Sequence, residues 1–129
     1  MIMSLKQNAG KPLGVICVDV NGMKKINSEY GSDEGDGYIL RTYHSLRTVA
    51  FQEDIFRSGG DEFAVFLPGI RKDVFERRVQ KLKNDPEYKD NKLYSIGSFW
   101  SDGCILPAEA LTAAEDVLLE SKKELYKME

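Results

Sequence analysis

The sequence comprises 129 residues, of which 42% are hydrophobic and 30% are charged. This length and composition suit one globular domain with a core of ordinary size, so we expect residues 1–129 to form a single domain. The 18 basic and 21 acidic residues give a net charge of -3, which leaves no basic face for nucleic acid. No apolar stretch is as long as a membrane span, and the N-terminus is not a signal peptide. We therefore expect a cytoplasmic domain without membrane contact, although a longer parent protein could be anchored in a membrane.

The cysteines and the single histidine argue against several kinds of site. Cys17 and Cys104 are far apart in the sequence and form no Cys-x-x-Cys pair, which fits a reducing compartment. His44 is the only histidine, so a histidine-rich zinc site or a Ser-His-Asp mechanism would depend on this one side chain. We expect His44 to lie on the surface of a helix.

The first half of the chain predicts one strand followed by two helices. Residues 13–20 are continuously apolar and rich in β-branched side chains, which is typical of a central strand covered on both faces. A short helix is expected over residues 23–30. A loop over residues 31–35 then leads to Asp36, whose side chain we expect to cap the next helix. Apolar residues recur at helical spacing in that next segment, at Ile39, Tyr43, Leu46 and Ala50.

The second half predicts a hairpin, a helix, a strand and a final helix. Residues 55–56 and 63–67 are strand-like and are joined through the two glycines of Ser58–Asp61, so we expect an antiparallel pair. The remaining elements are a helix carrying Phe75, Val79 and Leu82 that ends before Asp85–Pro86, a strand over residues 92–100, and an amphipathic helix after Pro107. This order predicts an α+β sandwich, with helices packed on a mostly antiparallel sheet.

Asp19 is unexpected in a strand that should be buried. An unpaired carboxylate there would cost several kcal/mol. One explanation is an aspartate at the frayed end of the strand, bonded to loop amides. The other is a ligand or partner that neutralises the charge.

The segment Arg57–Phe63 combines two glycines with two acidic residues at the start of a strand. Glycines let the backbone approach a ligand closely, whereas Asp61 and Glu62 are residue types that strands usually avoid. A hairpin turn alone would also explain the glycines. Together with Asp19, however, the acidic pair offers the carboxylate oxygens that Mg²⁺ prefers. Two metal ions bridged by Asp19 and Asp61 would stabilise the attacking and leaving oxygens of a phosphoryl displacement.

These residues match a known family pattern. Residues 15–67 resemble the GGDEF domain of diguanylate cyclases, with the name-giving motif intact as Gly59–Phe63. Four further segments are similar to family motifs: Asp19–Asn27 to D-x-D-x-F-K-x-I-N, Tyr30–Asp36 to G-H-x-x-G-D, Ser95–Gly97 to S-I-G, and Ala114–Lys122 to A-D-x-A-L-Y-x-A-K. The resemblance implies a ferredoxin-like sandwich of the palm type found in nucleotidyl cyclases.

The resemblance also implies a role for each matching residue. Mg²⁺ or Mn²⁺ would be held by Asp19, the Val20 carbonyl and Asp61. The guanine edge of GTP would be bound by Asn27 and Asp36, whose amide and carboxylate groups suit its donors and acceptors. The phosphates would meet the backbone of Gly22 and Met23, the side chains of Lys24 and Lys122, and the hairpin glycines Gly59 and Gly60. The catalytic residues implied are Asp61, Glu62 beside the metal, and Lys24, which Glu62 would orient.

Each of these residues also has a plainer interpretation when it is considered alone. Asn27 and Asp36 are typical of helix ends and caps. Lys24 and Lys122 would be solvated surface charges. The joint spacing around an intact Gly-Gly-Asp-Glu-Phe favours the functional interpretation.

Several positions depart from the family pattern. They are Asn21 in place of the second Asp, Ser32 in place of His, Glu115 in place of Asp, and Tyr126 in place of an Arg that contacts phosphate. Tyr126 weakens the triphosphate site most, because a phenol supplies no cationic fork, although Lys123 or Lys127 could compensate in part. Residues 50–53 read Ala-Phe-Gln-Glu in place of the Arg-x-x-Asp feedback site, so product inhibition there is not expected. The family's upstream D-x-L-T-x-L-x-N-R segment is missing, which indicates a trimmed or shortened relative.

Three functions stay open at this point. The first is a diguanylate cyclase that condenses two GTP into cyclic di-GMP with Mg²⁺, in a transient homodimer whose domains each hold one GTP. The second is a degenerate domain that binds GTP or nothing and signals to a neighbour without turnover. The third is a structural domain without nucleotide. In the first two cases, a sensory or regulatory domain in a longer parent protein is the expected partner.

Overall fold

The computed structural model describes residues 10–127, without the side chains of residues 24, 32 and 125–127. In chain order the elements are β1 (Leu13–Val20), α2 (Met23–Tyr30), α3 (Ser32–Arg47), a 3-10 turn (Gln52–Asp54), β2 (Ile55–Arg57), β3 (Glu62–Pro68), α4 (Lys72–Lys83), α5 (Pro86–Lys89), β4 (Tyr94–Ser101) and α6 (Pro107–Lys127). The expected order of strand, two helices, hairpin, helix, strand and helix is confirmed, with the short helix α5 added before the last strand. Within residues 10–127, no helix is both long and apolar enough to cross a membrane.

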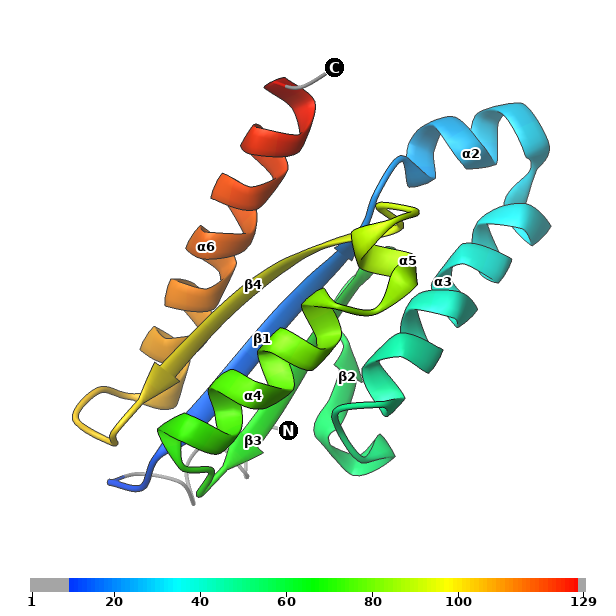
Figure 1. Cartoon of the computed structure of the whole chain (residues 1–129). Helices are drawn as coiled ribbons and strands as arrows, with labels where there is room; N and C mark the ends of the chain where they lie inside the picture. The colour runs from blue at the N-terminus through cyan, green and yellow to red at the C-terminus, as the bar shows by residue number, and fades with distance from the viewer. Residues whose placement is uncertain (1–9, 128–129) are drawn as a thin grey trace.

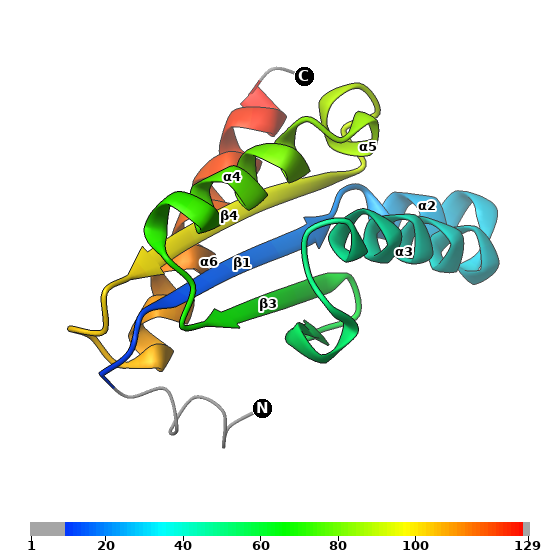
Figure 2. The ribbon, with the colours of Figure 1, turned by 60° about the horizontal axis from the view of Figure 1, so that its bottom comes forward.

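The four strands form one antiparallel sheet in the order β2-β3-β1-β4. β1 therefore lies between two neighbours, as its continuously apolar sequence predicts. Helices cover both faces: α6 lies alone on one face, and α3 and α4 lie on the other (Figures 1 and 2). The chain is thus the α+β sandwich that the element order predicts.

Successive side chains of β1 point to opposite faces of the sheet. The side chains of Ile16, Val18 and Val20 pack in a core with residues of α3 and α4. Those of Leu13, Val15 and Cys17 pack in a second core with Ala110, Ala114 and Leu118 of α6. Because side chains alternate along a strand, Asp19 continues the second series and faces α6.

Gly97 in β4 permits the close approach of α6 to the sheet. A Cβ atom at this position would lie 2.2 Å from the carbonyl oxygen of Ala114 and 2.3 Å from the amide nitrogen of Leu118. The Ser121 hydroxyl also donates a hydrogen bond of 2.9 Å to the carbonyl oxygen of Ile96. These contacts fix the position of the C-terminal half of α6 against the sheet.

The prediction of a loop over residues 31–35 with Asp36 as a cap is wrong. α3 begins at Ser32, directly after Gly31, so Asp36 lies inside the helix. Gly31 has φ of 88°, and such a backbone turn by one glycine replaces the loop. Asp33 supplies the negative charge that favours a helix start.

Two smaller predictions also need correction. α3 ends at Arg47, so Ala50 lies beyond the helix that its spacing predicted. The sequence analysis missed α5, a helix of 4 residues that starts with Pro86. Such a helix is shorter than the window in which helical spacing can be recognised.

The two cysteines and the histidine lie where the sequence predicts. Cys17 is buried in β1, Cys104 is exposed after β4, and both are free thiols. His44 lies on the exposed side of α3.

Candidate functional site

The end of β1 and the β2-β3 hairpin meet at one end of the sheet. The Val20 amide donates a hydrogen bond of 2.8 Å to the carbonyl oxygen of Asp61, which holds the hairpin turn against the strand end. Asp19 and Glu62 are directly opposite each other in the β1-β3 pairing. The acidic residues of the two motifs are therefore brought together.

Asp19 lies in a fully paired part of the sheet and is only 7% exposed. The interpretation as a frayed strand end bonded to loop amides is therefore wrong. One carboxylate oxygen, Oδ2, forms an ion pair with the ammonium group of Lys122. The other, Oδ1, is buried and has no hydrogen-bond partner within the described part of the chain. Lys122 thus neutralises Asp19 while leaving one oxygen available.

Burial raises the pKa of Asp19, and the neighbouring carboxylates of Asp61 and Glu62 raise this pKa further. The hydrogen bond and charge of Lys122 act in the opposite direction. One lysine therefore stabilises the ionised form against both desolvation and two like charges. A second cation at this position would relieve the remaining cost.

Further acidic groups lie on the same face of the sheet. Glu62 accepts a hydrogen bond of 3.1 Å from the Ser58 hydroxyl. Burial raises the pKa of Glu115 on α6, and the charge of Glu62 raises this pKa further. Glu62 and Glu115 both also contribute to raising the pKa of Cys17, after burial. Directly opposed carboxylates on neighbouring strands destabilise each other, so this end of the sheet favours cations.

The residues present fit a divalent cation that is shared with a ligand. No group of three or more His, Cys, Asp or Glu side chains in residues 10–127 could enclose a metal ion. Asp19 nevertheless offers an unpartnered oxygen, and Asp61 lies beside it. Mg²⁺ commonly takes one or two carboxylates and completes its shell with water and phosphate oxygens. Asp19, Asp61 and the Val20 carbonyl are the groups that would hold it.

The two residues assigned to guanine lie on adjacent helices. Asn27 is in α2 and Asp36 is in α3, and both are exposed. The helices touch at Gly35, where an added Cβ atom would be 2.0 Å from the Asn27 side-chain oxygen Oδ1. The Asn27 side chain therefore lies against the residue that precedes Asp36. Both residues are exposed to solvent.

The segment between β1 and α2 presents backbone amides. Gly22 precedes α2 with φ of 68°, and no side chain caps the helix start. The first amides of a helix have no partner within it, so they are suited to bind an anion. Met23 is buried and anchors this turn. The side chains of Lys24 and Tyr126 lie outside the described part of the structure.

The glycines of the hairpin motif are exposed at its tip. The Gly59 amide donates to the carbonyl oxygen of Glu62 at 3.4 Å, and the Arg57 guanidinium donates to that of Gly60. No Cβ contact closer than 3.8 Å would form at Gly59, and none within 4 Å at Gly60. The tip is therefore open to a ligand.

The sequence analysis missed the role of Asn21, which it treated only as a departure from the family pattern. The Asn21 side-chain amide donates to the carbonyl oxygen of Lys92 at 2.9 Å. Its Oδ1 accepts a hydrogen bond of 2.9 Å from the Ser95 hydroxyl. Asn21 thus joins the end of β1 to the start of β4, which no local sequence signal could reveal.

The chain is similar to known proteins in sequence and in fold. The chain matches the family described as diguanylate cyclase, GGDEF domain, over residues 2–128. It is 30% identical over 129 residues to an uncharacterized signaling protein of Caulobacter vibrioides, and 29% identical over 79 residues to the diguanylate cyclase DosC of Escherichia coli K12. These matches cover 90% and 60% of this chain.

The chain spans a small part of these relatives, namely 16% of the Caulobacter protein and 17% of DosC. Among solved structures, it resembles the diguanylate cyclase SiaD of Pseudomonas aeruginosa, determined in complex with its activator SiaC, with a TM-score of 0.77. This match has 18% sequence identity and covers 95% of this chain and 53% of that one. At this identity the likeness establishes the fold.

Proposed function

The chain belongs to the GGDEF domain family of diguanylate cyclases, and on that premise we propose that it condenses two GTP molecules into cyclic di-GMP. The observation that carries the proposal is the burial and incomplete pairing of the Asp19 carboxylate. This buried carboxylate has one oxygen paired with Lys122 and one without a partner, next to the acidic pair of the intact motif. A carboxylate with no catalytic or binding role would be stabilised better by a full set of hydrogen bonds.

The chain's own residues would bind and orient the nucleotide. Asn27 and Asp36 bind the guanine edge, and the backbone amides that follow Gly22 bind phosphate oxygens. Asp19 and Asp61 would hold Mg²⁺, which when bound would supply positive charge that favours loss of the 3′-hydroxyl proton and departure of pyrophosphate. Glu62 lies opposite Asp19 and adds negative charge beside that cation.

The reaction needs two domains, because each 3′-hydroxyl attacks the α-phosphate of the other GTP. We propose a homodimer that forms when GTP is bound and that aligns the two nucleotides by proximity. Sedimentation of the chain with Mg²⁺ and a non-hydrolysable GTP analogue should show a larger species than the chain alone. The parent protein would regulate this association through a further domain.

The proposal is tested by chromatography of the products formed from GTP and Mg²⁺ at high protein concentration. Wild type should form cyclic di-GMP, and Asp61→Asn should lower the rate by more than about 100-fold, since even residues outside a metal's coordination shell can change metal affinity 10- to 100-fold. Asp73→Asn is the matched control, because Asp73 is exposed on α4 and is bonded to Arg71. Equal rates for both variants, or no product from wild type, would reject the proposal.

A binding module without turnover is the second candidate. It is favoured by Tyr126, which is no phosphate-binding cation, and by the engagement of Lys122 with Asp19. Calorimetry with GTP and its non-hydrolysable analogue separates the two functions. Tight binding of both without cyclic di-GMP formation would identify the module, and no Mg²⁺-dependent effect of GTP on the melting temperature would indicate a structural domain.

A further inference from the structure

A polar pocket lies beside the candidate site, at the edge of the sheet. It has a volume of about 240 Å³ and is bounded by the end of α4, α5, the start of β4 and α6. Lysines provide three of its lining side chains, Lys83, Lys89 and Lys92. The volume is below the roughly 300–1,000 Å³ of pockets that hold whole small-molecule ligands, so the pocket suits a charged group of a ligand.

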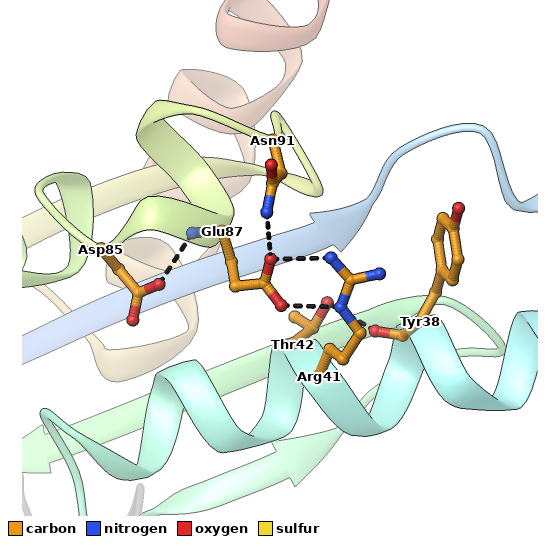
Figure 3. A network of polar contacts seen from close by, with 6 residues as sticks. All are labelled: Tyr38, Arg41, Thr42, Asp85, Glu87 and Asn91. Atoms are coloured by element: carbon orange, nitrogen blue, oxygen red, sulfur yellow. Dashed lines mark hydrogen bonds and ion pairs between the residues drawn. The ribbon is translucent and has the colours of Figure 1, made fainter.

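The three lysines are exposed and take part in no ion pair within the described residues. Two acidic side chains between Lys83 and Lys92 accept hydrogen bonds from groups that do not line the pocket (Figure 3). The Glu87 carboxylate accepts hydrogen bonds from the Arg41 guanidinium of α3 at 2.7 Å. Asp85 accepts a hydrogen bond of 2.9 Å from the Glu87 amide. Asp90 is not part of the pocket lining. The pocket lining therefore contains three lysines and no acidic side chain.

The backbone of Lys92 is held in an uncommon conformation. Its φ is 50°, the only positive value of a non-glycine residue within the described chain. Residues other than glycine adopt this region rarely and at a cost, unless the surroundings hold them there. The hydrogen bond from the Asn21 amide to the Lys92 carbonyl oxygen supports it. An aspartate at position 21, which the family pattern has, could not donate this bond.

The pocket adjoins the groups that would hold the nucleotide. Asn21 lines the pocket and lies two residues after Asp19, and Ser121 lines the pocket and directly precedes Lys122. One turn beyond Lys122, the chain has Tyr126 where the family pattern has a phosphate-binding arginine. The arginine of the family pattern is thus missing on α6, whereas three lysines line the adjoining pocket.

We propose that this pocket binds the terminal phosphates of a polyphosphate anion through Lys83, Lys89 and Lys92. Lysine ammonium groups bind phosphate oxygens as point charges and need no fixed geometry. The anion is inorganic polyphosphate or the phosphate end of a nucleotide. That GTP is the source rests on the proposed function, whereas binding of the inorganic anion does not.

The test is calorimetric titration of the chain with inorganic triphosphate at low salt. Wild type should bind, and Lys83→Gln with Lys89→Gln should weaken binding by about tenfold or more, as expected for the loss of charge-assisted contacts. Lys72→Gln with Arg77→Gln is the matched control, since it removes the same charge from the exposed first turns of α4, outside the pocket. The control should bind within about twofold of wild type. No binding by wild type, or equal loss in the two double variants, would overturn the proposal.

Titrations with GTP and guanosine identify the source and separate this proposal from the proposed function. The lysine double variant should lose affinity for GTP and keep its affinity for guanosine if the nucleotide reaches the pocket. Triphosphate binding that depends on the two lysines, without GTP binding, supports the pocket and rejects the cyclase. Cyclic di-GMP formation together with triphosphate affinity unchanged in the lysine double variant rejects the pocket and supports the cyclase.

Discussion

Replacement of Gly35 by alanine tests whether the Asn27 side chain contributes to guanine recognition. The new Cβ atom would lie 2.0 Å from Asn27 Oδ1, whereas ordinary contacts begin near 3.4 Å. The Asn27 side chain would therefore have to move by about 1.4 Å. A hydrogen-bonding group displaced this far loses its geometry with a bound base.

The expected effects on binding and on stability differ. Loss of a paired amide contact with a base corresponds to about 1–3 kcal/mol, so the preference for GTP over ATP should fall by about 5- to 150-fold. Stability should change little, because alanine is favoured over glycine inside a helix by about 1 kcal/mol and the exposed Asn27 side chain can move at low cost. Calorimetry with GTP and ATP measures the first effect, and urea unfolding measures the second.

Gly37→Ala is the matched control. Gly37 lies in the same helix, and an added Cβ atom would meet nothing within 4 Å. This variant should gain up to about 1 kcal/mol of stability and keep the nucleotide preference of wild type. If Gly35→Ala folds and still prefers GTP as wild type does, Asn27 does not read the base. If Gly35→Ala unfolds, the contact between α2 and α3 is less adaptable than the exposure of Asn27 indicates.

Three further predictions concern the fold. Gly97→Ala should lower the urea midpoint by an amount equivalent to at least about 1–3 kcal/mol, because the backbone of α6 lies 2.2 and 2.3 Å from the added atom. The Arg41 hydrogen bonds lower the pKa of Glu87 to about 2, so the pair stabilises the fold above pH 4.5 and ceases to do so as the pH falls toward 2. Since the pair is partly exposed, the loss in Glu87→Gln should be about 1 kcal/mol at pH 7 and close to zero near pH 2. Burial raises the pKa of Cys17 to about 12, so a thiol reagent at pH 8 should label only Cys104 in the native chain and both cysteines in denaturant.

The sheet could be predicted from the sequence because its signals are local. A short, continuously apolar run rich in β-branched residues favours a strand covered on both faces, and β1 occupies that position. The glycines of the hairpin identified its turn in the same way. The start of α3 was misjudged because Gly31 completes the change of direction alone, and no propensity distinguishes such a glycine from the first residue of a loop.

The candidate site was predicted in part. The proximity of Asp19 to the hairpin acids was implied by the resemblance to the GGDEF family, but the ion pair with Lys122 joins residues that are 103 positions apart. The lysine pocket could not be predicted, since Lys83, Lys89 and Lys92 come from three separate segments and have no regular spacing. Only the packing of α5 beside β4 brings them together.

The departures from the family pattern are better understood together than one by one. Asn21 in place of Asp removes one negative charge, and Tyr126 in place of Arg removes one positive charge, so the two changes cancel in formal charge. Asn21 also donates to Lys92, which an aspartate could not do. Three lysines line the pocket beside the candidate site, and α6 lacks the arginine of the family pattern. The enzyme and the binding module would differ in how the phosphates are aligned for reaction. Measuring both turnover and triphosphate affinity in the same lysine variants decides between these two functions.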